Sequence, residues 1–441
     1  MKIHLIAIGG SAMHNMALAL HQKGFNVTGS DDAIFSPSKE RLEKYNLLPN
    51  EIGWFPSKIT PDIDAIILGM HARENNPELK KAKHLNIPIY SYPEYIYEQS
   101  KNKKRIVISG SHGKTSITAM ILHILQNLDI DSDYMVGAQL EGFDTMVKLT
   151  DNAPIIILEG DEYLSSPIDR RPKFHLYQPH IAVLSGIAWD HINAFPTFDI
   201  YINQFRIFKN LVKDTLIYCS EDEELNKLCQ EKTKCKLIPY STPSHKINKG
   251  ITSLEDTKLL IFGNHNLQNL NAAKLVCNEL GVSDSDFYQK IATFKGASNR
   301  LELVKRTKTS AIYRDFAHSP SKLKATASAM KKQFTNRKLI ACIELHTFSS
   351  LNQKFLKQYS GCIDEPDTAI VYFSPTAIKH KKLEEITKEQ VYSAFNRQDL
   401  LVFTKSKKLE RYLKSQKWKN QNLLMMSSGN FEGIDIKSLL Q

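Results

Sequence analysis

The sequence predicts an α/β protein in which several parallel sheets carry nucleotide-binding loops. Three observations support this prediction. Short apolar runs alternate with helical stretches over residues 1–100, which is typical of a parallel sheet with crossover helices. The stretch "VISGSHGKTSITAM" (107–120) leads from an apolar run through glycines into a helix. Similar apolar runs follow later in the chain, among them "HIAVLSGIAWDH", "KLIACIEL" and "NLLMMSSGN". The length of 441 residues is enough for two or three domains.

The first expected unit begins at the N-terminus. "IHLIAIGG" predicts a strand, "SAMHNMALALHQKG" a helix closed by its last glycine, and "FNVTGSDD", "IDAIILGM" and "IPIYSYPE" three more strands. The turn after the first strand would present Gly9, Gly10 and Ser11 to a diphosphate, and Ser30 and Asp31 end the second strand, where a ribose or base is often recognised. Because these glycines do not match G-x-G-x-x-G, packing of the helix on the strand remains the alternative. A dehydrogenase that uses NAD would leave the later loop unexplained.

The second expected unit carries a phosphate loop. It follows the polar stretch "YEQSKNKKR" (97–105), which we interpret as a linker. Backbone N–H groups at a helix N-terminus bind anions, and glycine lets a phosphate approach closely. Lys114 is expected on the β- and γ-phosphates of ATP and the Thr115 hydroxyl on magnesium. Since Ile108 stands where the standard pattern has its first glycine, the loop is a variant form, and a plain glycine-rich turn is the alternative. The predicted ATP loop comprises Gly110, Ser111, His112, Gly113, Lys114, Thr115 and Ser116.

Candidate metal ligands follow the next apolar runs. "IIILEGDEY" places Glu159, Asp161 and Glu162 at the end of a strand, and a carboxylate there, near a phosphate loop, suits Mg²⁺. "WDHINAF" places Asp190 and His191 at the end of another run. From these residues alone, His191 is either a metal ligand or a core histidine.

Composition excludes several classes of protein. The formal net charge is +11, but the lysines are dispersed, which indicates a solvated surface that attracts anionic substrates rather than a nucleic-acid interface. No apolar run reaches the roughly 18 residues that span a bilayer, and we find no secretory signal. Six scattered cysteines without a CxxC pair fit a reduced cytosol better than a disulfide scaffold or a zinc site.

Several stretches together resemble the Mur ligase family. They are "GSHGKTS", "EGDEY", "WDH", "GNHNLQNLNAA" (263–273), "NRLE" (299–302) and "RDFAHSP" (314–320), which occur in the family's order along nearly the whole chain. The resemblance implies a three-domain Mur ligase architecture: a Rossmann-like domain for a UDP-sugar (1–101), a central P-loop ATPase domain for ATP and Mg²⁺ (102–296), and a Rossmann-like C-terminal domain for the incoming amine and part of the ATP (297–441). It also implies a cytoplasmic ATP-dependent amide ligase of peptidoglycan metabolism, a monomer or weak dimer that binds neither nucleic acid nor membrane.

The resemblance assigns roles to residues of this sequence. Lys114, His191 and Arg300 are expected to be catalytic, with Arg300 on the terminal phosphates of ATP. Thr115 and Glu159 would hold one magnesium ion, and His191 a second. The remaining ATP contacts that the resemblance implies are His265 against the adenine ring, Asn266 and Asn269 around it, and Asp315 on the ribose.

Two positions depart from the family's pattern. The family often has a glutamate three residues before the metal-binding histidine, where this chain has Ala188, so a contact behind the metal is missing or replaced. Arg206 lies near the position where sister enzymes carry a carbamylated lysine, so no carbamate is expected.

The resemblance also narrows the substrates. The first is expected to be UDP-N-acetylmuramate, whose carboxylate would form an acyl phosphate. "DEY" (161–163), "IDRRPKFHLYQP" (168–179) and "MSSGNFEGI" (426–434) favour the family member that adds the recycled tripeptide L-alanyl-γ-D-glutamyl-meso-diaminopimelate. Tyr163, His318 and His346 are then expected near the amine. A ligase that adds L-alanine is the alternative, and an ATP-binding regulatory protein without ligase activity is the more remote one.

Overall fold

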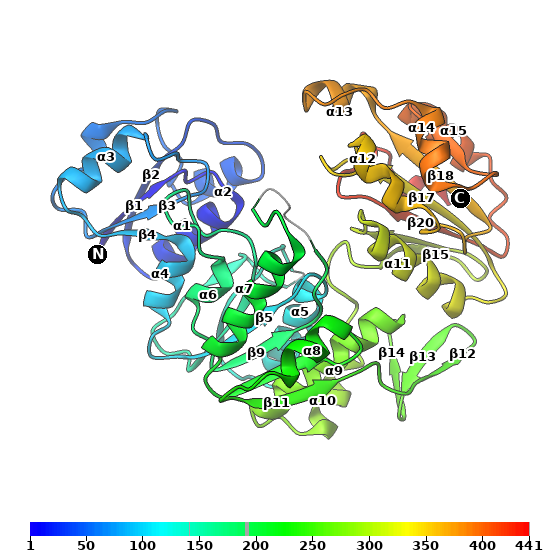
Figure 1. Ribbon diagram of the computed structural model, residues 1–441, viewed down its shortest axis with the longest axis horizontal. Helices are drawn as coiled ribbons and strands as arrows, with labels where there is room; N and C mark the ends of the chain where they lie inside the picture. The colour runs from blue at the N-terminus through cyan, green and yellow to red at the C-terminus, as the bar shows by residue number, and fades with distance from the viewer. Residues whose placement is uncertain (141, 190–193, 441) are drawn as a thin grey trace. The chain divides into compact units, whose positions relative to one another are not determined.

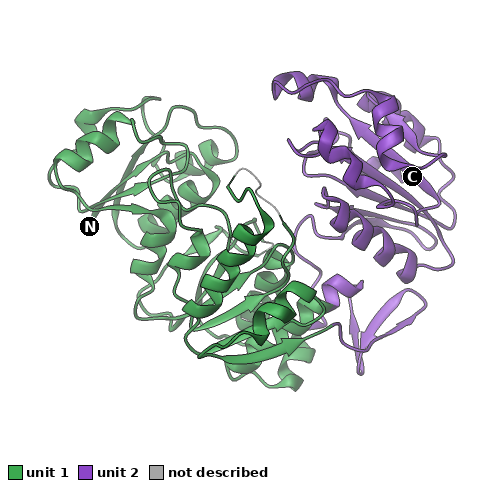
Figure 2. Cartoon of the chain, viewed as in Figure 1, with its two compact units in different colours: residues 1–241, 268–290 green, residues 242–267, 291–441 purple. Residues whose placement is uncertain are grey.

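The computed structural model describes residues 1–140, 142–189 and 194–440. The chain divides into two compact units, which are described separately (Figure 2). The first comprises residues 1–241 and 268–290, and the second comprises residues 242–267 and 291–441. Sheets of mainly parallel strands connected by helices make up both units (Figure 1). The predicted α/β class is therefore confirmed.

The first sheet has four parallel strands in the order β2-β1-β3-β4. All four were expected from the sequence, and α1 ends just before Gly24, whose φ of 88° is the left-handed conformation that terminates helices. Because the strands are parallel, the turn after β1 and the end of β2 lie at the same edge. The elements are β1 (Lys2–Ile6), α1 (Ser11–Gln22), β2 (Asn26–Ser30), α2 (Ser38–Lys44), η1 (Pro56–Lys58), β3 (Ala65–Leu68), α3 (Pro77–His84), β4 (Ile89–Ser91) and α4 (Tyr92–Gln99).

The second sheet of this unit has seven strands in the order β11-β10-β9-β5-β8-β6-β7, and β7 pairs antiparallel with β6. Since β9, β5 and β8 are neighbours and parallel, the loops that follow them meet at one edge. The elements are β5 (Lys104–Ser109), α5 (Lys114–Asn127), β6 (Ser132–Met135), β7 (Val147–Lys148), β8 (Ile155–Gly160), α6 (Lys173–Leu176), β9 (Ile181–Leu184), α7 (Phe198–Leu211), β10 (Thr215–Cys219), α8 (Glu223–Gln230), β11 (Lys236–Tyr240), α9 (Asn264–Glu279) and α10 (Asp284–Ile291).

The stretch predicted as a linker is ordered structure instead. Residues 97–99 end α4, and residues 104–105 begin β5. The Arg105 side chain is buried, and its guanidinium donates to the carbonyl oxygens of Ser100 (2.7 Å) and Tyr177 (2.9 Å). The charged composition of this stretch suggested solvent exposure, but Arg105 satisfies the carbonyls directly after α4 and α6. The predicted domain boundaries at 101 and 296 do not coincide with the limits of the two compact units and stay a prediction.

The second unit holds a small antiparallel sheet, β12-β13-β14, and a six-stranded sheet in the order β15-β16-β20-β17-β18-β19, in which β15 pairs antiparallel with β16. The elements are β12 (Lys246–Asn248), β13 (Ile251–Leu254), β14 (Thr257–Leu259), β15 (Glu302–Arg306), β16 (Ala311–Asp315), α11 (Pro320–Gln333), β17 (Lys338–Leu345), α12 (Gln353–Leu356), η2 (Lys357–Tyr359), β18 (Thr368–Phe373), α13 (Pro375–His380), α14 (Lys388–Phe395), β19 (Leu401–Phe403), α15 (Ser406–Lys414), β20 (Gln421–Met426) and η3 (Ile436–Leu439).

Two apolar clusters cover the two faces of the six-stranded sheet. Along β17, Leu339 and Ile343 belong to one cluster, and Ile340 and Cys342 belong to the other. This burial on both faces explains why "KLIACIEL" is almost continuously apolar. All six cysteines of the chain are buried and form no disulfide. Within the described residues, no helix is long and apolar enough to cross a membrane.

Candidate active site

The predicted phosphate loop connects β5 to α5. Gly110 has a φ of 120° and Gly113 a φ of 80°, a region that glycine adopts without strain. A Cβ atom at Gly113 would overlap the side-chain amide of Asn269, and one at Gly110 would overlap Ser185. The loop therefore needs glycine at both positions. No side chain at these positions covers the backbone N–H groups at the start of α5.

Lys114 is held at the mouth of this loop by an ion pair that the sequence did not predict. Its Nζ donates to the carbonyl oxygen of Gly110 (2.6 Å) and to Oε2 of Glu162 (2.8 Å). Burial alone would lower the pKa of Lys114, but Glu162, Asp161 and Glu159 outweigh it and raise the pKa. Lys114 is thus a cation at neutral pH, as phosphate binding requires.

Thr115 and Glu159 offer adjacent oxygen ligands at the ends of the loop and of β8. The Thr115 hydroxyl donates to Oε2 of Glu159 (3.1 Å), and the Gly137 N–H donates to Oε1 (2.8 Å). A hydroxyl and a carboxylate suit a hard cation such as Mg²⁺. His191, the other predicted ligand, and its neighbour Asp190 lie outside the described residues. In the described part of the chain, no three His, Cys, Asp or Glu residues form a metal-binding group.

A hydrogen-bond network behind the loop includes one residue, Tyr201, that sequence reasoning missed. The Ser111 hydroxyl donates to the carbonyl of Ala188 (3.0 Å) and accepts from its N–H (2.8 Å). The same hydroxyl lies 3.1 Å from the hydroxyl of Tyr201, which donates to Glu162 (3.2 Å). Ser111 thus holds the backbone at the position where the family often has a glutamate. Tyr201 lies 90 residues from Ser111, and no local pattern marks it.

We expect Glu162→Gln to tighten the binding of ATP roughly threefold to tenfold, because a triphosphate no longer meets the carboxylate that pairs with Lys114. Titration calorimetry with ATP and Mg²⁺ measures this change. Glu43→Gln removes the same charge from an exposed position on α2 and is expected to leave the affinity unchanged. Weaker binding by Glu162→Gln would contradict this account.

The expected adenine ligands lie on α9. Asn266 and Asn269 are three residues apart and share one face of the helix. Both are buried, and Nδ2 of Asn266 donates to the Phe262 carbonyl (3.0 Å). Burial lowers the pKa of His265 to about 4, so its ring is neutral at pH 7 and suited to stacking on a base.

The predicted phosphate and ribose ligands of the second unit lie next to each other. Arg300 stacks on the Phe316 ring, 4.8 Å from the guanidinium carbon to the ring centre. Asp315, at the end of β16, accepts from the N–H groups of Leu301 and Ala317 (both 2.6 Å). Burial raises the pKa of Asp315, and Arg300 opposes that effect.

The two histidines expected near the amine follow different strands of the same sheet. Nδ1 of His318 lies 2.8 Å from the Phe316 carbonyl oxygen. Nδ1 of His346 lies 3.7 Å from Oε1 of Glu344, whose other oxygen accepts from Ser427 (2.5 Å). Both histidines therefore lie at the carboxyl edge of the six-stranded sheet, where ligands of α/β proteins bind.

The glycine turn after β1 is closed by an acid. Asp31 is buried and accepts from the Gly9 N–H (2.7 Å), and burial raises its pKa. Ser30 is fully buried, and among the described residues its hydroxyl has no hydrogen-bond partner. Gly9 and Gly10 are partly exposed and Ser11 is exposed, so these three are the accessible members of the predicted UDP-sugar set.

Arg41 and Asn15 join this turn to the second sheet and were also missed. The Arg41 guanidinium donates to Gln139 (2.8 Å), and the side-chain oxygen of Asn15 accepts from the Met146 N–H (2.9 Å). Neither residue lies in a recognisable motif. They bring polar groups of α1 and α2 next to the segment before β7.

Comparison with known proteins identifies the family. Residues 2–104 match the family model described as "Mur ligase family, catalytic domain", and residues 108–277 match "Mur ligase middle domain". UDP-N-acetylmuramate–L-alanine ligase of Caldicellulosiruptor bescii is 31% identical over 414 residues, which cover 89% of this chain and 87% of the relative. The chain belongs to the Mur ligase family. Mur ligases are ATP-dependent ligases that form C–N bonds, and this chain is such an enzyme.

Other relatives and solved structures agree with this assignment. The enzyme of the same name from Clostridium kluyveri is 30% identical over 390 residues, covering 84% of this chain and 82% of the relative. In fold, the chain matches UDP-N-acetylmuramate-alanine ligase from Thermotoga maritima, with a TM-score of 0.70, 19% identity and coverage of 98% and 96%. It also matches murein peptide ligase from Psychrobacter arcticus, with a TM-score of 0.64, 23% identity and coverage of 100% and 98%. The predicted three-domain Mur ligase architecture is confirmed.

The prediction that this Mur ligase adds the recycled tripeptide is wrong. Several curated relatives that match over most of the chain are named UDP-N-acetylmuramate–L-alanine ligase. The prediction depended on short stretches whose side chains serve other contacts: Arg171 pairs with Glu94 (3.0 Å), and Lys173 pairs with Asp161 (2.5 Å). Tyr163 lies in the same loop, where its carbonyl accepts from the Lys173 N–H (2.9 Å). Such packing contacts do not identify the amine.

Proposed function

We propose that this Mur ligase joins UDP-N-acetylmuramate to L-alanine at the expense of ATP. Similarity over most of the chain to enzymes named UDP-N-acetylmuramate–L-alanine ligase carries the proposal. The charged Lys114 at a bare phosphate loop supports the same chemistry, because it places a fixed cation where a triphosphate binds at a helix N-terminus.

The first step is transfer of a phosphoryl group. The carboxylate oxygen of UDP-N-acetylmuramate attacks the γ-phosphorus of ATP, the bond to the β,γ-bridging oxygen breaks, and ADP leaves. Both reactants are anions, so their approach depends on fixed positive charge. Lys114 and Arg300 supply this charge. Thr115 and Glu159 would hold Mg²⁺, which neutralises phosphate oxygens when it is bound.

The second step forms the amide. The neutral amino group of L-alanine attacks the acyl carbon, inorganic phosphate leaves as the bond between its oxygen and that carbon breaks, and the proton lost from the nitrogen ends on the released phosphate. The same cations stabilise the departing phosphate. His318 and His346 are proposed near the amine, since both lie at the carboxyl edge of the six-stranded sheet. The proposed ATP set is completed by Gly110, Ser111, His112, Gly113, Ser116, His265, Asn266, Asn269 and Asp315, and the proposed UDP-sugar set is Gly9, Gly10, Ser11, Ser30 and Asp31.

The cellular setting belongs to the same proposal. ATP and a UDP-sugar are cytoplasmic metabolites, so we propose that the enzyme acts in the cytoplasm. A monomer or weak dimer is proposed as its oligomeric state. His191 is proposed as a further magnesium ligand, and the three domains are proposed to divide at residues 101 and 296.

The deciding experiment measures phosphate release and product mass with purified protein, ATP, Mg²⁺ and UDP-N-acetylmuramate. L-alanine is added to one reaction, D-alanine to a second and the tripeptide to a third. We expect an amide product only with L-alanine. A product that forms with the tripeptide and not with L-alanine would overturn the proposal.

A further inference from the structure

The positive charge of the chain is concentrated in its C-terminal part. Residues 297–441 contain 26 lysines and arginines and 13 aspartates and glutamates, which gives this segment a formal net charge of +13. The whole chain has a formal net charge of +11, so the rest of the chain is slightly acidic. Of these cations, the proposed active site uses Arg300 alone. The other lysine and arginine side chains repel one another, and this repulsion destabilises the fold unless anions are bound.

Part of this surplus surrounds one cavity of about 560 Å³. The cavity lies beside the amino ends of β17, β18 and β20, which run parallel to β16. Asp315 is the last residue of β16 and His346 follows β17, so both lie at the carboxyl ends of these strands. The cavity is therefore at the edge of this sheet opposite to the one where Asp315 and His346 lie. Its charged lining consists of Lys331, Arg337, Lys338, Lys417, Lys419 and Asp367.

Asp367, the acidic residue of this lining, already has hydrogen-bond and ion-pair partners. Asp367 accepts from Lys331 Nζ (2.8 Å) and from the Leu339 N–H (2.7 Å). Among the residues that the structure describes, the other four cations of the lining pair with no carboxylate. Four positive charges without a counter-charge thus face one cavity.

Arg337 is fixed in place by neutral groups. It stacks on Phe334, 5.1 Å from the guanidinium carbon to the ring centre, and donates to the side-chain oxygen of Asn422 (3.1 Å) and to the Lys308 carbonyl (3.3 Å). Burial and the nearby Arg306 lower its pKa, which is the opposite of what a carboxylate partner would do. A rigid guanidinium suits two-pronged recognition of a phosphate.

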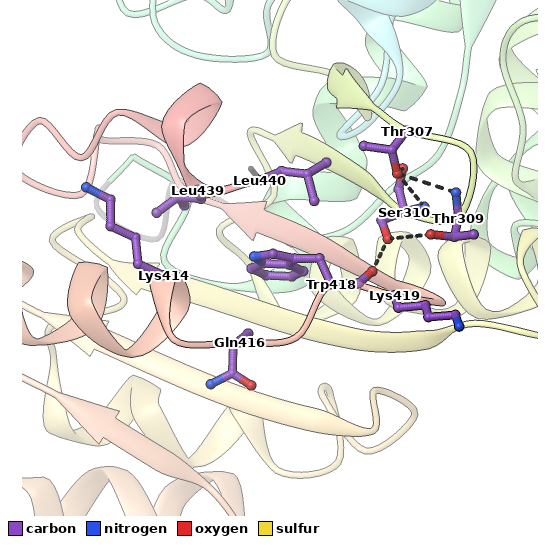
Figure 3. Close-up of a pocket in the computed structure, with 9 residues that line it drawn as sticks. All are labelled: Thr307, Thr309, Ser310, Lys414, Gln416, Trp418, Lys419, Leu439 and Leu440. Carbon is purple, nitrogen blue, oxygen red and sulfur yellow. Dashed lines mark hydrogen bonds between the residues drawn. The ribbon is translucent and has the colours of Figure 1, made fainter.

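Two further donors in the same segment lack acceptors. Nε2 of Gln421, which lines the cavity, and Nε1 of Trp418 are buried, and neither has a hydrogen-bond partner among the described residues. Trp418, Lys414 and Lys419 all line a neighbouring cavity of about 440 Å³ (Figure 3), and Lys419 lines both cavities. Buried donors without acceptors are costly, and an anion offers the acceptors that they lack.

We propose that the cavity around Arg337 is a binding site for a small anion that carries phosphate groups, separate from the ATP site. Arg337 contacts two phosphate oxygens, Lys417 and Lys419 neutralise the remaining charge, and Gln421 donates the last hydrogen bond. Binding stabilises the second unit by mass action.

The test uses the full chain saturated with ADP and Mg²⁺, so that the phosphate loop is filled. Pyrophosphate is titrated at constant ionic strength, and both binding heat and the midpoint of thermal unfolding are recorded. We expect a saturable rise of the midpoint in the wild type. Lys417→Gln/Lys419→Gln changes exposed side chains and is expected to weaken binding roughly tenfold or more, since it removes two charge-assisted contacts.

Two variants separate a specific site from general charge. Lys407→Gln/Lys408→Gln removes the same charge from exposed positions on α15 and is expected to bind pyrophosphate as the wild type does. Arg337→Lys keeps the charge but loses the planar fork, and we expect it to bind more weakly. No saturable binding by the wild type, or equal weakening by both double variants, would overturn the proposal.

Discussion

Lys114→Ala is expected to slow ligation by at least about 10²-fold, because it removes a preorganised cation from the developing charge of the phosphoryl transfer. The position of the Lys114 side chain in the phosphate loop supports this expectation. Lys114 Nζ lies against the Gly110 carbonyl inside the loop and is kept charged by Glu162. Phosphate release with saturating ATP, UDP-N-acetylmuramate and L-alanine measures the rate. A turnover like that of the wild type would refute this role.

The same substitution also changes stability, so controls are needed. Without Lys114, the buried Glu162 carboxylate loses this ion pair, and the fold is expected to weaken. Lys114→Ala/Glu162→Gln removes both charges. We expect this double variant to regain stability but to catalyse ligation as slowly as Lys114→Ala does. Lys213→Ala, at an exposed position, serves as the control for charge and should keep the full rate.

Lys103→Met is expected to lower the free energy of unfolding by about 3–5 kcal/mol, the usual effect of breaking a buried ion pair on one side. Lys103 Nζ pairs with Asp133 (2.8 Å), and both side chains are buried. Nζ also donates to the carbonyl oxygens of Thr150 (2.7 Å) and Ala153 (2.9 Å). Methionine fills the volume but leaves the Asp133 charge and two carbonyls without this donor.

Urea unfolding followed by circular dichroism measures the loss. Lys101→Met is a matched control two residues earlier, because Lys101 pairs with Glu98 at the surface, and such pairs contribute little. Lys103→Met/Asp133→Leu removes both charges and is expected to recover part of the loss. An unchanged unfolding curve for Lys103→Met would show that the buried pair contributes nothing.

Local patterns were enough to predict the central elements of the site. The phosphate loop is one contiguous stretch in which strand, glycines, lysine and helix follow each other, so its geometry depends on neighbours in the chain. Glu159 was found for a similar reason, since it ends an apolar run that is buried on both faces. The strands "IHLIAIGG" and "KLIACIEL" were also recognisable from apolar content alone.

Identification of the amine failed because short stretches were given more weight than they carry. "DEY" and "DRRPKF" are compatible with several packing roles, and Arg171 and Lys173 form ion pairs inside the first unit. Discrimination between L-alanine and a tripeptide depends on the shape and polarity of a pocket that many residues form. Similarity over most of the chain samples many of those residues at once, which explains why it corrected the prediction.

The sequence by itself determined the α/β class, the phosphate loop and the acid at the end of β8, because each depends on residues adjacent along the chain. The tertiary structure alone decided how Lys114 is held. Glu162 is 48 residues away, Tyr201 joins Ser111 across 90 residues, and Ala188 is reached across 77. Hydrogen bonds and ion pairs of this kind depend on distances between side chains, and only the packing of the strands brings those side chains together.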